Sequence, residues 1–206
     1  MANRKPKKNY AGKTNESSLH DRCQTPDYAL DPLFDYLKPE WTLWEPARGE
    51  GYLERALQAQ GRTVVSGDLI TGQNFFDDDH LPSQWDAMVT NPPFSVKYKW
   101  MARAYRLGKP FALIVPIDTL GAGAAQRLFK HYGFEWIFFD RRIDYGMPNI
   151  GFENSHSQFA SMWVTHGLNI GRPVTFWEIK KRPQEPMQAL KAVKSVQQLT
   201  LFGESN

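Results

Sequence analysis

The chain has 206 residues, which is enough for one folded domain with a buried core. Aromatic residues make up 14% of the sequence, and this content excludes disorder of the whole chain. The formal net charge of +3 is compatible with a polyanionic partner and equally with an ordinary, mildly basic protein, while a single cysteine, Cys23, excludes an intrachain disulfide and a cysteine-based metal cage.

The two ends of the chain differ in composition from its centre. Residues 1–21 are polar and begin with a run of basic residues, so we predict a flexible basic arm. Residues 22–180 are predicted to form the folded domain, and residues 181–206 a flexible tail with a short apolar cluster. No apolar run suits a membrane span or a signal peptide, and we expect a cytoplasmic protein without membrane association.

Between these ends, strand-like and helix-like segments alternate. The first helix is predicted to begin at Asp31 and Pro32, which resemble an N-cap and first-turn pair, and to reach Leu37. Further helices are predicted at residues 52–60, 96–107 and 122–131, and strands at residues 41–44, 63–66, 87–90, 111–117, 134–139, 159–164 and 174–179. This alternation predicts an α/β protein with a mainly parallel sheet that is covered on both faces.

A glycine-containing loop lies between the first predicted strand and the helix that begins at residue 52. It reads Glu45-Pro46-Ala47-Arg48-Gly49-Glu50-Gly51. Glycines let the backbone approach a ligand closely, and the N-terminus of a helix presents unpaired N–H groups. The loop lacks the Lys-Ser/Thr ending of a P-loop, which disfavours a triphosphate ligand.

The next strand ends at Asp68, where a carboxylate can accept hydrogen bonds from both hydroxyls of a ribose. Glu45, in the loop, can accept from an ammonium group. A ligand that combines a ribose and an ammonium group without phosphates is S-adenosylmethionine, which we therefore predict as the cofactor.

The sequence Asn91-Pro92-Pro93-Phe94 follows the apolar residues 85–89. Two consecutive prolines fix two φ angles and remove two backbone donors, so this segment is predicted to be a rigid bend at the end of a strand. The amide of Asn91 can accept an amino proton, and the ring of Phe94 can stack. This pair suits a planar group that carries an amine, such as a nucleobase.

Together, the glycine loop, Asp68 and the Asn-Pro-Pro-Phe motif resemble the S-adenosylmethionine-dependent amino-methyltransferases, above all the DNA adenine-N6 methyltransferases. The resemblance covers about residues 25–164, and the motif order is similar to the γ arrangement of these enzymes. It implies a Rossmann-like methyltransferase fold, with a mostly parallel seven-stranded sheet and helices on both faces. Residues 22–180 would then be the methyltransferase catalytic domain.

The resemblance also implies roles for particular residues. The cofactor-binding residues would be Thr25, Glu45, Ala47, Gly49, Gly51, Asp68, Asn74 and Phe75. The catalytic residues would be Asn91, Pro92, Pro93 and Phe94. Asn91 and the Pro92 carbonyl would accept hydrogen bonds from the target amine, while Phe94 stacks on the base. No metal is expected, and the acidic residues 77–80 are interpreted as a solvated loop.

The implied reaction is methyl transfer from S-adenosylmethionine to the N6 amino group of adenine in DNA, in a flipped-out or single-stranded base. Methylation of RNA adenine or of a protein glutamine amide is an alternative. Relatives with those substrates more often carry Tyr where this chain has Phe94, which favours DNA. A catalytically silent nucleic-acid-binding subunit is a further alternative, against which the intact glycine loop and Asn-Pro-Pro-Phe motif argue.

A short apolar motif lies near the end of the chain. Gln198-Leu199-Thr200-Leu201-Phe202 is similar to the pentapeptide by which replication proteins dock on the bacterial sliding clamp. Gln198, Leu199, Leu201 and Phe202 would be the binding residues, with the apolar side chains in a groove; packing on their own domain is the alternative. Only about forty residues follow Val164, whereas γ enzymes usually carry a large recognition domain there. We therefore expect targeting by loops or by a partner, in a bacterium or a phage-infected bacterial host.

Overall fold

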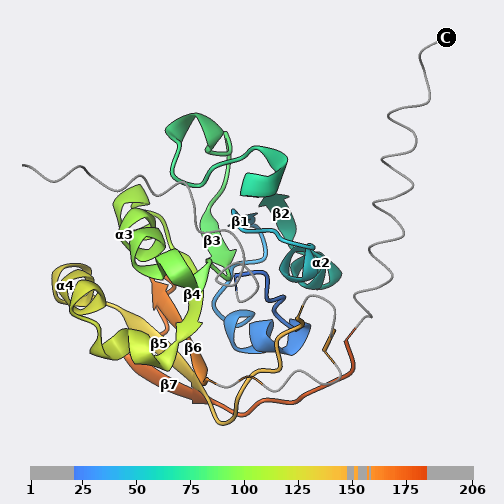
Figure 1. Ribbon diagram of the computed structural model, residues 1–206, viewed down its shortest axis with the longest axis vertical. Coiled ribbons are helices and arrows are strands. Elements are labelled where there is room, and N and C mark those ends of the chain that lie inside the picture. Colours follow the sequence, from blue (N-terminus) through green and yellow to red (C-terminus); the bar gives the residue numbers. More distant parts are fainter. Residues whose placement is uncertain (1–20, 148–150, 153–156, 158, 185–206) are drawn as a thin grey trace, which may run out of the picture.

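The computed structural model describes residues 21–147, 151–152, 157 and 159–184. Seven strands form one sheet in the order β2-β1-β3-β4-β6-β5-β7 (Figure 1). They are β1 (Thr42–Glu45), β2 (Thr63–Ser66), β3 (Ala87–Thr90), β4 (Phe111–Pro116), β5 (Glu135–Phe139), β6 (Ser161–His166) and β7 (Val174–Trp177). Strand β6 runs antiparallel to β4 and β5, and the other neighbouring pairs are parallel. The predicted α/β class with a mostly parallel seven-stranded sheet is confirmed.

Helices cover both faces of this sheet, as predicted (Figure 1). The α-helices are α2 (Tyr52–Ala59), α3 (Lys97–Leu107) and α4 (Gly123–Tyr132). Short 3-10 helices are η1 (Asp27–Leu33), η2 (Leu69–Thr71), η3 (Asp78–His80), η4 (Phe94–Val96) and η5 (Ile117–Gly121). Within the described residues, no helix has the length and apolarity needed to cross a membrane.

Alternating side chains of the central strands enter two separate cores. On β4, Ala112 and Ile114 pack in the core that contains η1 and α2. Their neighbours Leu113 and Val115 pack in the core that contains α3 and α4. Because successive strand residues point to opposite faces, a continuous apolar strand requires cover on both sides. This explains why the apolar residues 111–115 form β4, the middle strand of the sheet, which is buried on both faces.

The predicted start of the first helix is wrong. η1 begins at Asp27, after Pro26 as its N-cap, and it contains Pro32 rather than starting there. Tyr28 and Leu30 are buried together with Leu33, so packing against the core draws the earlier residues into the turn. A 3-10 helix also needs few internal bonds, so the missing N–H of a proline is tolerated.

The direction in which the chain adds strands to the sheet reverses between β1 and β3. Strands β2 and β3 lie on opposite sides of β1 and run parallel to it. The connections that leave the carboxyl ends of β1 and β3 therefore diverge, which makes a topological switch point, the usual ligand site of an open α/β sheet. The glycine loop follows β1 there, and the Asn-Pro-Pro-Phe motif follows β3.

The described chain continues past β7 and returns to the first helix. The Arg182 guanidinium bonds to Asp27 at 2.8 Å and to both carboxylate oxygens of Asp31 at 2.9 and 3.0 Å. Gln184 also bonds to Asp27, at 2.7 Å. These contacts involve residues that were predicted to belong to the tail.

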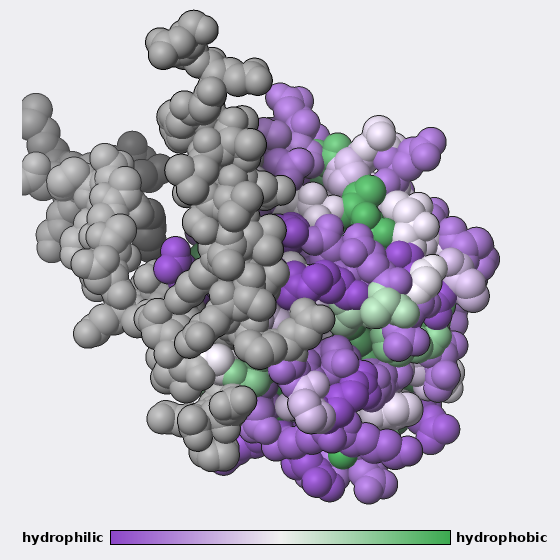
Figure 2. All heavy atoms as spheres, turned by 90° about the vertical axis from the view of Figure 1, so that its right-hand side faces the viewer, coloured by the Kyte–Doolittle hydropathy of each residue, from purple (hydrophilic) through white to green (hydrophobic). Residues whose placement is uncertain are grey.

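The face shown in Figure 2 is mostly hydrophilic, with small separated hydrophobic spots.

Candidate active site

The glycine loop is held in a conformation that depends on its glycines. Gly49 and Gly51 have φ angles of +53° and +79°, in the left-handed region that side chains other than glycine rarely adopt. The Arg48 N–H donates to the Gly67 carbonyl at 2.9 Å, and the Gly67 N–H donates to the Glu45 carbonyl at the same distance. These bonds fasten the loop to the end of β2. Gly51 is the N-cap of α2, so the loop feeds directly into a helix N-terminus.

Asp68 connects this loop to the segment that follows β2. Its Oδ2 accepts from the Gly49 N–H and its Oδ1 accepts from the Ile70 N–H, both at 2.8 Å. An ionised carboxylate has about four acceptor positions, so two backbone bonds leave capacity for further donors. Asp68 is thus placed beside the glycine loop, where the sequence analysis expected a ribose ligand.

Glu45 is a buried carboxyl group at the end of β1. Its side chain is 1% exposed, and its Oε2 has no hydrogen-bond partner in the described part of the protein. Burial raises its pKa well above the usual value, and the negative charge of Glu54 acts in the same direction. Arg48 opposes this rise, but its guanidinium also forms an ion pair with Glu54 at 2.5 Å. Glu45 is therefore easier to protonate than an ordinary glutamate, and an approaching cation would act against this rise of its pKa.

Gln24, in the N-terminal segment, lies against the same loop and is followed by the buried residue Thr25. Thr25 is 3% exposed, and no hydrogen-bond partner for its Oγ1 is found among the described residues. The Gln24 Oε1 accepts from the Glu50 N–H at 3.1 Å. Ala47 packs at the edge of the core formed with α3 and α4. The structure thus places Gln24 in contact with a loop that follows more than twenty residues later.

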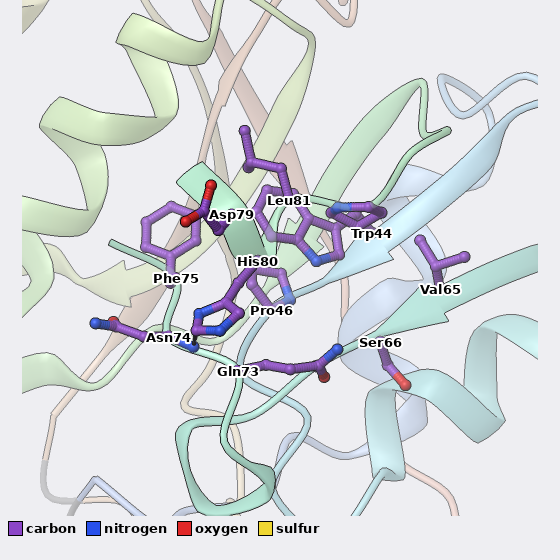
Figure 3. A pocket seen from close by; sticks show the side chains of 12 residues that line it. Trp44, Pro46, Val65, Ser66, Gln73, Asn74, Phe75, Asp79, His80 and Leu81 are labelled. Atoms are coloured by element: carbon purple, nitrogen blue, oxygen red, sulfur yellow. Dashed lines mark hydrogen bonds between the residues drawn. The ribbon is translucent and has the colours of Figure 1, made fainter. Parts of the chain in front are cut away.

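A cavity of about 250 Å³ opens beside the ends of β1 and β2 (Figure 3). Its lining combines residues of these strand ends with the loop between β2 and β3: Trp44, Pro46, Val65, Ser66, Gly67, Gln73, Asn74, Phe75, Asp79, His80, Leu81 and Pro82. Asn74 and Phe75 belong to the lining, as a cofactor role requires. Gln73 and His80 were not predicted, because neither belongs to a recognisable motif.

Hydrogen bonds within the loop shape the wall of this cavity. The Asn74 Oδ1 accepts from the Phe76 N–H at 3.0 Å, and the Asn74 N–H donates to the His80 Nδ1 at 3.1 Å. Phe75 is buried and stacks on Trp100 of α3, with 3.9 Å between the ring centroids. Phe75 therefore anchors the loop in the core, and part of its surface faces the cavity.

The acidic residues of this loop have structural partners. The Asp78 Oδ1 accepts from the Arg103 guanidinium at 2.7 Å, and the Asp77 Oδ1 accepts from the Asp79 N–H at 3.1 Å. Over the residues that the structure describes, no group of three or more His, Cys, Asp or Glu side chains is arranged to hold a metal ion.

In the Asn-Pro-Pro-Phe motif, the amide of Asn91 is oriented by a hydrogen bond to the Cys23 carbonyl. The Asn91 Nδ2 donates to the Cys23 carbonyl at 3.3 Å, while its Oδ1 is buried without a hydrogen-bond partner among the described groups. Pro92 is buried, and Pro93 is the N-cap of η4. The bend after β3 thus presents an unused acceptor, because the donor end of the same amide is already engaged.

Phe94 belongs to a group of aromatic rings. It meets Phe159 edge to face, with 5.4 Å between centroids and an interplanar angle of 78°. Tyr145 lies 6.3 Å from Phe94 at 86°, and its hydroxyl bonds to the Ser161 Oγ at 2.8 Å. The structure therefore adds Phe159 and Tyr145 to the surroundings of the motif. Both come from the region after β5: Tyr145 lies between two predicted strands, Phe159 was predicted as the first residue of the strand at residues 159–164, and neither was predicted as part of a site.

Buried polar atoms without partners recur among the predicted site residues. Thr25 Oγ1, Glu45 Oε2 and Asn91 Oδ1 are such atoms, and so is the Oγ1 of Thr90, which immediately precedes Asn91. Buried polar groups are normally hydrogen-bonded, and each exception requires an explanation. Glu45 and Thr90 end the neighbouring strands β1 and β3, at the switch point of the sheet. A polar ligand at this edge would satisfy these atoms.

The predicted clamp-binding residues, Gln198, Leu199, Leu201 and Phe202, lie outside the described residues. So do residues 1–20 of the predicted basic arm.

Comparison with known proteins identified no matching family model and no matching curated protein. Among solved structures, the chain is similar to a modification subunit of a putative type I restriction enzyme from Vibrio vulnificus, with a TM-score of 0.47 and 12% identity over 95% of this chain and 55% of that one. The chain thus spans about half the length of that subunit.

Two smaller proteins give similar results. A predicted O-methyltransferase from Agrobacterium tumefaciens has a TM-score of 0.42 and 12% identity over 81% of this chain and 95% of that one. A putative class I S-adenosylmethionine-dependent methyltransferase from Listeria monocytogenes has a TM-score of 0.42 and 10% identity over 86% of this chain and 71% of that one. These similarities concern the fold alone. The mostly parallel seven-stranded sheet described above confirms the predicted Rossmann-like α/β fold class.

Proposed function

We propose that this chain transfers a methyl group from S-adenosylmethionine to the N6 amino group of adenine in DNA. The observation that carries the proposal is the hydrogen bonding of the Asn91 side-chain amide. Its amide nitrogen is bonded to the Cys23 carbonyl, and its buried Oδ1 has no partner within the described structure. An acceptor fixed in this way on a rigid bend is suited to bind an amino group.

The residues at the switch point fit S-adenosylmethionine. Gly49 and Gly51 allow close approach of the backbone, and the unpaired Glu45 Oε2 is an acceptor suited to the ammonium group. Asp68 retains acceptor capacity for ribose hydroxyls, and the cavity lined by Asn74 and Phe75 adjoins it and suits a flat base. When bound, the cofactor supplies a methyl group on a positively charged sulfur.

The chain's own residues would activate the target amine. The N6 lone pair of adenine is delocalised into the ring, which makes the amine a weak nucleophile. Asn91 Oδ1 and the Pro92 carbonyl would accept its two hydrogens and draw them out of the ring plane, so that the lone pair becomes available. Phe94 would hold the base by stacking. Positioning and fixed dipoles of this kind account for large rate effects in enzymes.

The target base must leave the helical stack to reach this bend, because its amine is inaccessible inside a duplex. The Phe94 ring, with Phe159 and Tyr145 around it, offers the aromatic surroundings that an unstacked base requires. Methylation of RNA adenine or of a glutamine amide uses the same acceptors and is the alternative activity. The C-terminal motif at residues 198–202 supports sliding-clamp docking as a means of reaching DNA, by sequence alone.

Replacement of Asn91 tests the proposal. We expect Asn91→Ala to reduce methyl transfer to DNA by about 100-fold or more, since a preorganised acceptor is lost. The Kd for S-adenosylmethionine, measured by calorimetry, should stay within about twofold, because Asn91 is placed for the base rather than for the cofactor. Gln126→Ala, which removes an exposed amide of α4, is the control and should behave as the wild type. Unchanged turnover in Asn91→Ala would refute the assignment.

A further inference from the structure

A short segment at the start of the described chain contacts both functional loops. Residues 21–24, here called the N-terminal tie, lie at the Asn-Pro-Pro-Phe bend, at the glycine loop and at the loop after β5. These contacts join residues that are far apart in the sequence. We propose that the N-terminal tie sets the orientation of Asn91 and Phe94, with Asp21 as a positioning residue.

The first contact fixes both ends of the Asn-Pro-Pro-Phe bend. The Asp21 Oδ1 accepts from the Ser95 N–H at 3.2 Å, and its Oδ2 accepts from the Ser95 Oγ at 2.6 Å. Two residues later, the Cys23 carbonyl accepts from the Asn91 Nδ2 at 3.3 Å. Asn91 begins the bend and Ser95 directly follows Phe94, so the tie holds the motif at both sides. Hydrogen bonds to an ionised carboxylate are stronger than those between neutral groups.

The second contact reaches the glycine loop. The Gln24 Oε1 accepts from the Glu50 N–H at 3.1 Å, and the Gln24 Nε2 donates to the Arg22 carbonyl at 2.9 Å. A Cβ atom placed on Gly49 would lie 2.8 Å from the Gln24 Nε2, so this side chain lies directly over the glycine. The loop and the tie are therefore packed against each other without spare room.

The third contact involves the loop after β5. Gln24 and Gly146 form an antiparallel bridge, with N–H to carbonyl distances of 2.8 Å in both directions. The Cys23 Sγ lies 3.1 Å from the Met147 Sδ. Gly146 directly follows Tyr145, which is one of the rings beside Phe94. The tie thus also fixes the loop that carries part of the aromatic surroundings.

These contacts have a consequence for Asn91. The rotation of an asparagine amide about its last torsion is broad in energy, so an external bond must select the orientation. In the described structure, the bond to the Cys23 carbonyl supplies that selection and leaves Oδ1 directed away from it. Because this acceptor is a main-chain group, its position depends on what anchors the segment. Asp21 is the side chain of the tie that anchors it to the bend itself.

The proposal rests on the proposed function for its catalytic readout, and replacement of Asp21 tests it. We expect Asp21→Ala to lower kcat for methyl transfer about tenfold, since a small displacement of a catalytic group has large effects on rate. The Kd for S-adenosylmethionine should stay within about twofold, because Asp21 is proposed to act on the base-binding residue Asn91 and not on the cofactor. Asp21→Asn keeps one carbonyl acceptor for Ser95 and should give an intermediate kcat. Asp35→Ala, which changes an exposed aspartate after η1, is the matched control.

A second readout does not depend on catalysis. The side-chain amide of Asn91 gives a pair of ¹H–¹⁵N signals, which the Asn91→Ala variant assigns. In Asp21→Ala these signals should shift or broaden, while the backbone spectrum and Tm stay close to those of the wild type. An unchanged Asn91 signal together with an unchanged kcat would overturn the proposed role of Asp21 in positioning Asn91. A fall in kcat that is matched by loss of the folded spectrum would also overturn it, in favour of a purely structural role.

The two readouts separate the tie from the proposed function. If the wild type transfers no methyl group to any nucleic acid, the proposed function fails. The Asn91 signal alone then tests whether the N-terminal tie orients Asn91. If the wild type methylates DNA and Asp21→Ala does so at the same rate with the same Asn91 signal, the proposed role of the N-terminal tie is refuted, and the proposed function stands.

Discussion

At the scale of single residues, the site is defined by buried polar atoms that lack partners. Glu45 shows this most clearly, because a carboxyl group that is 1% exposed has an oxygen without a hydrogen bond in the described structure. Leaving a buried polar group unsatisfied costs about 1–3 kcal/mol, so the proposed function predicts that a bound ligand supplies the missing partner of this oxygen. The same reasoning applies to the Asn91 Oδ1.

The raised pKa of Glu45 predicts a pH-dependent stability of the cofactor-free protein. Burial raises this pKa in the folded state above its value in the unfolded chain, so the folded state binds the proton more tightly. The contribution to the free energy of unfolding is therefore present below the ordinary glutamate pKa and is lost as the pH rises through the raised pKa.

Urea unfolding over a series of pH values measures this effect in the wild type and in Glu45→Gln. The glutamine variant cannot titrate at this position. We expect the stability of the wild type to fall relative to Glu45→Gln as the pH rises. If the two proteins show parallel pH profiles, Glu45 does not titrate abnormally, and its assignment as an acceptor for a cation loses support.

At the scale of elements, the loops at the carboxyl ends of β1 and β3 depend on backbone geometry. Gly49 and Gly61 both have a positive φ, of +53° and +72°, but their surroundings differ. A Cβ on Gly49 would meet the Gln24 side chain at 2.8 Å, whereas a Cβ on Gly61 meets nothing within 4 Å. Substitution of either glycine would strain the backbone, but only substitution of Gly49 would also disturb a neighbouring side chain.

We expect Gly49→Ala and Gly61→Ala each to lower the free energy of unfolding by about 1–2 kcal/mol, the cost of a left-handed residue. Only Gly49→Ala should weaken binding of S-adenosylmethionine, by about tenfold or more, since it displaces Gln24 from the glycine loop. Thermal unfolding and calorimetry measure both quantities. Equal cofactor affinity in the two variants would contradict a role of this loop in cofactor binding.

The elements themselves were largely predictable from the sequence. Strands β2 and β3 were predicted at their observed bounds, because short apolar runs flanked by polar residues mark them clearly. The predicted strand at residues 159–164 instead forms at Ser161–His166, where it pairs along the full length of β4. Pairing with a neighbouring strand sets such limits, and a single segment does not contain that information.

The assembly of the site was less predictable than its motifs. The glycine loop, Asp68 and the Asn-Pro-Pro-Phe motif were predictable from their positions after successive strands and from their order along the chain, since their residue types alone are those of ordinary turns. The hydrogen bond from Asn91 to the Cys23 carbonyl joins positions 68 residues apart and involves a main-chain acceptor. No residue type signals such a contact. His80 likewise reaches the cavity because its Nδ1 accepts from the Asn74 N–H, which is a local geometric outcome.

At the scale of the whole molecule, the sheet brings the motifs together. Strands β2 and β3 flank β1, and because the three strands are parallel, the glycine loop and the Asn-Pro-Pro-Phe bend leave the sheet at the same end. One core contains η1 and α2 and the other contains α3 and α4, so the sheet is packed on both faces. The chemistry proposed for the protein therefore depends on long-range packing as much as on the motifs.

The most direct test of adenine methylation identifies the methylated group. The wild type is incubated with methyl-labelled S-adenosylmethionine and separate preparations of unmethylated DNA, RNA and protein, and each labelled fraction is digested to its monomers. We expect the label in DNA, as N6-methyl-2′-deoxyadenosine, and its loss with Asn91→Ala. Label that appears only in RNA or in protein glutamine, on another base of DNA, or in no fraction would contradict the proposed function.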